Sequence, residues 1–110
     1  MTAKLVGVHL HLKAIDLTAG EQLKPRIRKM NPQHTVPILD DSGFYVCEGH
    51  AICAYLVNRY AKDDTLYPKD PQKRAVVDQK LYFDLGQFYS SFADSYVNWF
   101  ESIFIGGLPV

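Results

Sequence analysis

Short apolar segments fill the first half of the chain, and a long helical pattern fills the second. Residues 9–15 at first alternate polar and apolar positions, which predicts a half-buried strand. Residues 2–6 suit the last turns of a helix, which Gly7 can end as a C-cap residue. After a turn, a short helix is predicted over residues 22–30, where Pro25 fits only the first turn.

The middle of the chain carries the pattern of a β-hairpin followed by a helix. Two apolar tetrapeptides, residues 36–39 and 44–47, flank the sequence Asp-Asp-Ser-Gly, and glycine there suits a tight turn. A helix is then predicted over residues 48–60, because four apolar residues recur at close to helical spacing. These are Ile52, Tyr55, Leu56 and Tyr60.

The last third of the chain is predicted to be helical. Residues 63–70 form a linker, and Asp70 and Pro71 have the residue types of an N-cap and a first helical position. The helix can continue to about Tyr96, and residues 97–110 are predicted to be irregular. Its apolar positions are Val77, Leu81, Leu85, Phe88 and Phe92. We therefore expect three parts: an α/β domain over 1–62, the linker, and the start of an α-helical domain over 71–110.

Composition narrows the function classes. The 110 residues hold 12 Lys and Arg against 12 Asp and Glu, so the formal net charge is zero and no basic surface for nucleic acid is indicated. No apolar run approaches the length of a membrane span, and residues 1–5 carry no signal-peptide pattern. Cys47 and Cys53 form neither a CxxC pair nor a zinc-finger spacing, so we expect reduced thiols, a cytoplasmic protein and no metal site.

Several segments together resemble the cytosolic glutathione S-transferases, most closely the insect delta and epsilon classes. The resemblance covers about residues 3 to 96 and implies an α/β thioredoxin-like N-terminal domain followed by the first helix of an all-α C-terminal domain. The segments that carry it are Gly20-Glu21-Gln22-Leu23-Lys24-Pro25, Lys29-Met30-Asn31-Pro32-Gln33-His34-Thr35-Val36-Pro37, Leu39-Asp40-Asp41, Ala51-Ile52-Cys53-Ala54-Tyr55-Leu56, Leu66-Tyr67-Pro68-Lys69-Asp70-Pro71, Lys73-Arg74-Ala75-Val76-Val77 and Leu81-Tyr82-Phe83-Asp84.

Two departures from the family pattern set further expectations. The family begins with a strand and a loop that carries a catalytic serine, whereas the first serine here is Ser42, in the predicted hairpin turn. The family's helical domain continues well past its first helix, whereas here one predicted helix is followed by a tail that does not resemble the family. We therefore expect a chain that is truncated at both ends, lacks the first strand and has no assignable catalytic residue. Without that strand, residues 9–15 would either pair directly with residues 36–39 or leave the domain unstable.

The resemblance implies a glutathione site around Val36 and Pro37. The Val36–Pro37 bond would be cis, and the Val36 backbone would pair with the cysteinyl backbone of glutathione by strand addition. His34 would bind the glycyl carboxylate, and Gln22 could donate to the same group. Judged from the residues alone, His34 and Gln22 are more simply solvated loop side chains, and Pro37 is a trans proline at the start of a strand.

The helix predicted after the hairpin would hold the other end of glutathione. The N–H groups and partial positive charge at a helix N-terminus suit the γ-glutamyl carboxylate, and Glu48 could pair with the ammonium group. Gly49 stands where the family usually has serine, so the chain keeps an N–H but loses a hydroxyl. His50 could contact the ligand or lie at the surface.

Tyr89 and Phe92 match positions that line the hydrophobic second-substrate pocket in delta-class relatives. Aromatic residues at helical spacing are more often core residues, which is the interpretation for Tyr82, Phe83 and Phe88.

By resemblance, the protein uses glutathione as co-substrate, conjugates it to small hydrophobic electrophiles in detoxification, and forms homodimers through the helices beginning at Glu48 and Pro71. Two alternatives remain. The first is a non-catalytic glutathione-binding or dimerising module, or an inactive fragment. The second is a thioredoxin-type redox protein with Cys47 as its candidate, which the lack of CxxC disfavours.

Overall fold

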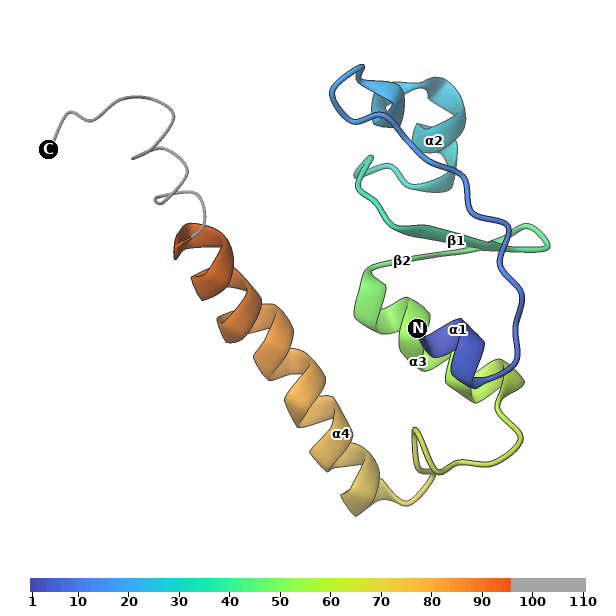
Figure 1. Ribbon diagram of the computed structural model, residues 1–110, viewed down its shortest axis with the longest axis vertical. Helices are drawn as coiled ribbons and strands as arrows, with labels where there is room; N and C mark the ends of the chain where they lie inside the picture. Colours follow the sequence, from blue (N-terminus) through green and yellow to red (C-terminus); the bar gives the residue numbers. More distant parts are fainter. Residues whose placement is uncertain (96–110) are drawn as a thin grey trace, which may run out of the picture. The chain divides into compact units, whose positions relative to one another are not determined.

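The computed structural model describes residues 1–95 of the chain (Figure 1). Its internal contacts define two compact units, one over Met1–Pro68 and one that begins at Lys69. We describe each unit by itself.

A two-stranded antiparallel hairpin forms the centre of the first unit. Strand β1 (Ile38–Asp41) pairs with β2 (Phe44–Cys47), so that Ile38 faces Cys47 and Asp41 faces Phe44. The two turn residues have φ angles of 54° at Ser42 and 90° at Gly43. A two-residue turn with positive φ at both positions matches the right-handed twist of the strands. The predicted hairpin is therefore confirmed, although β1 starts at Ile38 rather than Val36.

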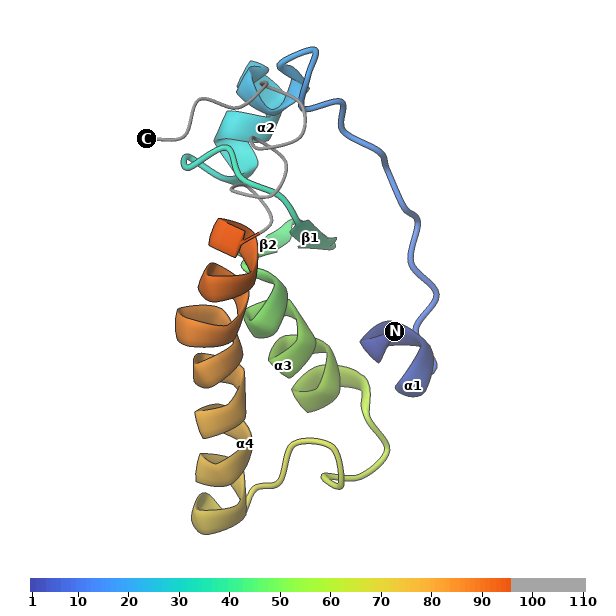
Figure 2. The ribbon, with the colours of Figure 1, turned by 60° about the vertical axis from the view of Figure 1, so that its left-hand side comes forward.

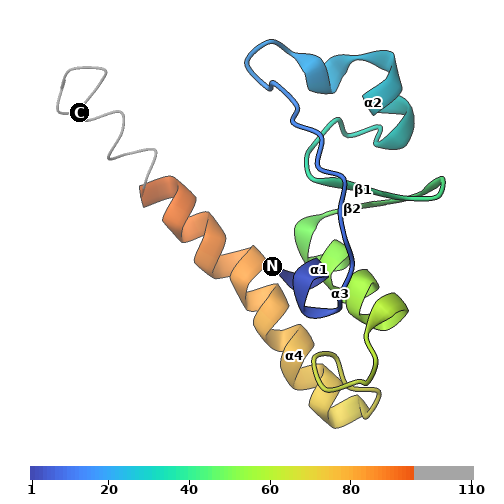
Figure 3. The same cartoon turned by 45° about the vertical axis from the view of Figure 1, so that its right-hand side comes forward.

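Helix α3 (Gly49–Tyr60) follows β2 and provides two of the four buried apolar residues in the first unit. Its side chains Leu56 and Val57 are buried, and so is Ala3 of the short helix α1 (Thr2–Leu5). Helix α1 packs against α3 (Figure 3). The Thr2 hydroxyl donates to Cys53 Sγ at 3.2 Å. The predicted helix is confirmed, with Glu48 as its N-cap residue rather than a helical one.

The strand predicted over residues 9–15 is wrong. That segment runs from α1 toward the next turn without regular structure, as its blue trace shows in Figure 2. Among residues 1–95 the sheet consists of β1 and β2 alone, so residues 9–15 have no neighbouring strand to complete their backbone hydrogen bonds. Leu12 is 88% exposed as a result. The segment does not pair with residues 36–39 as one alternative required.

The helix predicted over residues 22–30 is divided in two. A 3₁₀ helix, η1 (Glu21–Leu23), is followed by α2 (Pro25–Met30), with Lys24 extended between them at φ −59° and ψ 142°. The residue before a proline is disfavoured in the helical conformation, which explains the break at Lys24. Pro25 takes the first helical position as predicted, and Ile27 is buried.

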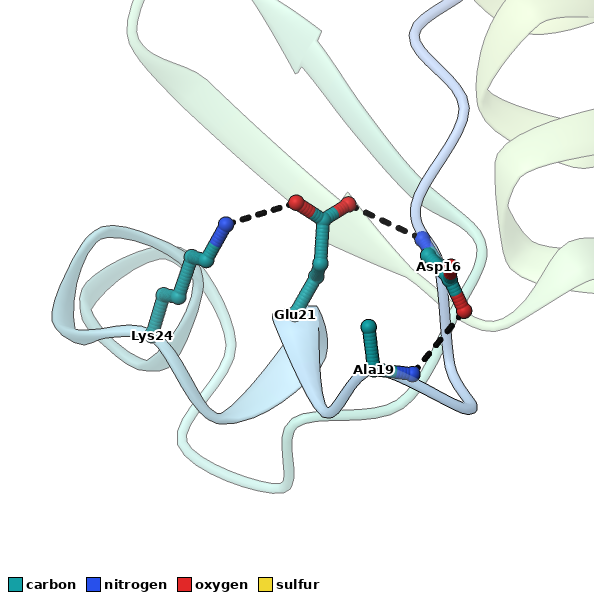
Figure 4. A network of polar contacts seen from close by, with 4 residues as sticks. All are labelled: Asp16, Ala19, Glu21 and Lys24. Carbon is teal, nitrogen blue, oxygen red and sulfur yellow. Dashed lines mark hydrogen bonds and ion pairs between the residues drawn. The ribbon is translucent and has the colours of Figure 1, made fainter.

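A polar network holds η1 against the preceding turn (Figure 4). The Glu21 carboxylate accepts from Lys24 Nζ at 2.6 Å and from the Asp16 backbone N–H at 2.9 Å. The Asp16 carboxylate accepts from the Ala19 N–H at 2.9 Å. The Lys24 ammonium, with the Asp16 N–H, holds the pKa of Glu21 below its usual value. The network fixes the backbone that carries Gln22, one of the predicted site residues.

The second unit is helical over its described residues. Helix α4 (Pro71–Phe83) begins as predicted, because the Asp70 carboxylate accepts from the Lys73 N–H at 2.9 Å and Pro71 follows it. The π-helix η2 (Asp84–Phe88) continues it, and residues 89–95 are again α-helical. No helix in residues 1–95 is long and apolar enough to span a membrane. The irregular segment predicted over residues 97–110 lies outside the described residues.

One carboxylate joins the hairpin to α3. Asp41 accepts hydrogen bonds from the Tyr55 hydroxyl at 2.7 Å and from the Tyr60 hydroxyl at 2.6 Å. The hydrogen bond from Tyr60, followed by the one from Tyr55, lowers the pKa of Asp41, and the same two bonds raise the pKa values of both tyrosines. The Tyr55 ring also lies 5.3 Å from the Phe44 ring, measured between centroids. We call Asp41, Tyr55 and Tyr60 the Asp41 clamp.

The Asp41 clamp predicts a specific pH dependence of stability. A lowered folded-state pKa stabilises the fold above the ordinary aspartate value of 3.8, and this contribution is lost as pH falls through the folded-state pKa. Raised tyrosine pKa values stabilise the fold below the ordinary value of 10.0, and this contribution is lost as pH rises through the folded-state values.

We therefore expect the melting temperature of the wild-type chain to exceed that of Asp41→Asn at neutral pH, with a gap that narrows below about pH 4. Thermal melts from pH 2 to pH 8, followed by circular dichroism, measure the gap. Asp40→Asn is the matched control. It makes the same change at the neighbouring carboxylate, which accepts from the Gly43 N–H in the turn and not from the two tyrosine hydroxyls. A gap that keeps its full size down to pH 2 would contradict the account.

Candidate functional site

The strand register brings two separate parts of the sequence to one end of the hairpin. Ile38 and Cys47 are paired, so Val36 and Pro37 directly precede one partner, and Glu48 and Gly49 directly follow the other. Paired residues in an antiparallel ladder have Cα atoms only about 4.5–5.5 Å apart. The open end of the hairpin therefore juxtaposes the two halves of the predicted ligand site.

Val36 lies just outside β1 and is 41% exposed. The Val36–Pro37 peptide bond is cis, as the resemblance implies. An exposed residue just before the start of a strand leaves its backbone open to strand addition by an extended peptide.

Asn31 organises the loop that precedes Val36, and the sequence analysis did not identify it. Among the described residues, Asn31 is the one polar residue that is buried, with 4% of its surface exposed. Its amide nitrogen donates to the Thr35 carbonyl at 3.1 Å and to the Thr35 hydroxyl at 2.9 Å, while its amide oxygen accepts from the Gln33 N–H at 3.1 Å. The Asn31-Pro32 dipeptide, a turn signal, was the available sequence sign.

His34 lies on this loop, and Gln22 lies on η1. The His34 N–H donates to the Asn31 carbonyl at 2.9 Å, and the His34 backbone is left-handed, with a φ of 48°. The His34 residue is exposed. Gln22 is half-buried, and within residues 1–95 its amide oxygen has no hydrogen-bond partner. The amide nitrogen, rather than this oxygen, is the group that could donate to a carboxylate.

The N-terminus of α3 forms the other half of the site. Glu48 has a φ of 73°, and its carbonyl accepts from the Ile52 N–H at 2.9 Å, which begins the helical bonding. The first N–H groups of a helix have no intrahelical partner and lie at its positive end. Gly49 and His50 are half-buried in this first turn. A Cβ added at Gly49 would meet no atom within 4 Å.

Tyr89 and Phe92 belong to the second unit. They are three residues apart on one helical face and are 64% and 61% exposed. Tyr82, Phe83 and Phe88 are also exposed, at 73%, 56% and 61%. We predicted that these three residues pack in a core. Within residues 1–95 that prediction is wrong, because no other described element covers their side chains.

The other polar groups and the surface hollow in the described part of the chain do not belong to this site. The Tyr55 and Tyr60 hydroxyls donate to Asp41. Residues 1–95 contain no cluster of three or more metal-ligating side chains. A shallow hollow lies along α2, lined by Pro25, Arg28, Lys29 and Pro32, and it includes none of the predicted site residues.

Comparison with known proteins identifies the class to which this fold and site belong. The family model for the N-terminal domain of glutathione S-transferase matches residues 1–59. A delta-class glutathione transferase from Nilaparvata lugens is 52% identical, with a TM-score of 0.86, over 99% of this chain and 50% of its own. A Bombyx mori glutathione transferase is 45% identical, with a TM-score of 0.88, over 99% and 49%. A Drosophila mojavensis homologue solved with bound glutathione is 46% identical, with a TM-score of 0.74, over 77% and 39%.

The first unit therefore has the thioredoxin-like fold of a glutathione transferase N-terminal domain, in which the described sheet has two strands. The chain belongs to the glutathione S-transferase family, and its solved relatives include delta- and epsilon-class insect enzymes. It spans about half the length of the Nilaparvata lugens and Bombyx mori structures that it matches.

Replacing Asn31 tests its role in shaping the loop. Asn31→Ala removes three hydrogen bonds and leaves their partners in a partly buried loop, at a cost of about 1–3 kcal/mol in the free energy of unfolding. Urea unfolding measures the change. Gln33→Ala is the control, because that side chain is exposed in the same loop. Equal stability of the two variants would contradict the role of Asn31.

Replacing Gly49 tests the site at the helix N-terminus. Gly49→Ser restores the hydroxyl usual in the family, and the open space around Gly49 admits the side chain. A hydrogen bond to a charged group contributes about 1.5–3 kcal/mol, so glutathione should bind at least about tenfold more tightly. Calorimetric titration measures the affinity, with Gly49→Ala as the control that adds Cβ without the hydroxyl. Equal affinity for the serine and alanine variants would exclude a carboxylate at this position.

Proposed function

We propose that the chain binds glutathione at the open end of its hairpin. The observation that carries the proposal is the Ile38–Cys47 pair, because Val36 and Pro37 directly precede one partner and Glu48 and Gly49 directly follow the other. The family and the glutathione bound to the Drosophila mojavensis homologue support the ligand's identity.

Each end of glutathione would meet groups of matching chemistry. The Val36 backbone would pair with the cysteinyl backbone, and His34, with Gln22, would hold the glycyl carboxylate. The γ-glutamyl carboxylate would accept from the first N–H groups of α3, including those of Gly49 and His50. The Glu48 carboxylate would pair with the γ-glutamyl ammonium group, while Pro37 shapes the backbone between the two halves.

For the protein's activity, we propose conjugation of glutathione to small hydrophobic electrophiles, as in detoxification. The attacking group is the glutathione thiolate, and a lower thiol pKa raises the reactive fraction near neutral pH. Tyr89 and Phe92, exposed on one helical face, are the proposed lining of the electrophile pocket. Homodimerisation, a linker over residues 63–70 and cytoplasmic location are parts of the same proposal, and the two free thiols, Cys47 and Cys53, fit a reducing compartment.

A glutathione-binding module without catalysis is the second candidate. It is favoured by the Asp41 clamp, because the Tyr55 and Tyr60 hydroxyls donate to Asp41 rather than being available to a thiolate. Our proposal names no hydroxyl among residues 1–95 that would donate a hydrogen bond to the glutathione thiolate. The two candidates share the binding site and differ in turnover.

Thermal melts with and without glutathione test the shared site. Ligand at 100 times its dissociation constant stabilises the native state by about 2.7 kcal/mol, so the melting temperature should rise with glutathione concentration. His34→Ala should reduce the rise, and Lys4→Ala, an exposed change on α1, should leave it unaltered. A melt indifferent to millimolar glutathione would refute the proposal.

Turnover then separates the two candidates. Mixing the chain, glutathione and an aryl chloride electrophile should give thioether product above the uncatalysed rate if the chain is an enzyme. Binding without product would establish the module instead.

A further inference from the structure

The orientation of α3 relative to the hairpin is fixed at two points. The first is covalent, because Glu48 alone separates the end of β2 from the start of α3. The second is the Asp41 clamp at the turn end of the hairpin. Asp41 lies about 10 Å along the strand from Ile38, at 3.3 Å per residue, and Tyr55 lies about 9 Å along α3 from Gly49, at 1.5 Å per residue. The hairpin and the helix are thus joined both through Glu48 and through the Asp41 clamp.

The covalent point coincides with the proposed ligand site. Rotation about Glu48 would swing α3 away from the hairpin and turn the Gly49 N–H group relative to the Val36 backbone. The Asp41 clamp opposes this rotation, and because it lies far from the pivot, a short hydrogen bond there restricts the angle strongly. A binding group must be held within about 0.5 Å of its productive position, so this angle matters to affinity.

We propose that Asp41, Tyr55 and Tyr60 are positioning residues for the γ-glutamyl end of glutathione: by tying α3 to the turn end of the hairpin, they align the Gly49 N–H with the backbone of Val36. The inference rests on the proposed function. It assigns no ligand contact to the three residues, which act through the angle of α3. The glycyl end of the ligand, held by the loop around His34, lies outside their influence.

The test uses a variant that removes both donors and keeps both rings. Tyr55→Phe/Tyr60→Phe retains the ring contact with Phe44 and the Arg59 guanidinium, whose carbon lies 5.5 Å from the centroid of the Tyr60 ring. Tyr45→Phe is the matched control, because Tyr45 is exposed on β2 and lies outside the clamp. NMR titrations of the 110-residue chain, below the melting temperature of each variant, measure affinity for two ligands: glutathione, and the dipeptide Cys-Gly, which lacks the γ-glutamyl group.

The inference predicts that the double variant binds glutathione about two- to thirtyfold more weakly, the range for residues that act without touching the ligand, and binds Cys-Gly as the wild-type chain does. The Tyr45→Phe control should match the wild-type chain with both ligands. General loosening of the fold would weaken both ligands alike, and that result would overturn the inference, as would unchanged glutathione affinity in the double variant. Failure of the wild-type chain to bind glutathione would refute the proposed function itself, and the inference with it.

Discussion

The pairing of Ile38 with Cys47 is the constraint on which the candidate site depends. It follows from the two-residue turn, because positive φ at Ser42 and Gly43 allows one hairpin geometry and therefore one register. A shift of one residue would change which residues meet at the open end of the hairpin and would turn the side chains of the shifted strand to the opposite face. The site is thus a consequence of a turn that lies at the opposite end of the hairpin.

The elements that could be predicted from the sequence are those determined locally. The Ser-Gly turn fixed the hairpin, and the Asp70-Pro71 pair fixed the start of α4, because caps and tight turns depend on only a few neighbouring residues. The break at Lys24 is also local, since it follows from Pro25. The sequence analysis missed it because apolar residues at helical spacing on both sides favoured one continuous helix.

Features that depend on distant partners could not be predicted in the same way. Residues 9–15 have the pattern of a strand, but a strand needs a neighbour, and pattern alone does not supply one. The double hydrogen bond to Asp41 joins residues 14 and 19 positions apart, which no spacing rule connects. The exposure of Tyr82 and Phe83 has the same origin, since an apolar helical face is buried only where another element covers it. The Asn31 side chain, by contrast, bonds to residues two and four positions on, and the Asn31-Pro32 turn signal was its local sign.

Family membership suggests glutathione as the ligand for this geometry. Gly49 is a position at which the chain departs from the family pattern. In the proposed site, the N-terminus of α3 and the loop held by Asn31 would supply hydrogen-bond donors to the carboxylates of a small peptide. A glycine at the first helical position keeps the backbone donor without the hydroxyl. The proposed binding of glutathione therefore depends on backbone groups at the open end of the hairpin. It does not require that the chain also catalyses conjugation.

A map of backbone amide shifts during glutathione titration tests that claim most directly. The account predicts that His34, Val36, Gly49 and His50 shift together along one saturation curve, while Ser42 and Gly43 at the turn end remain unchanged. Shifts confined to one side of the hairpin's open end, or centred on the hollow along α2, would contradict it.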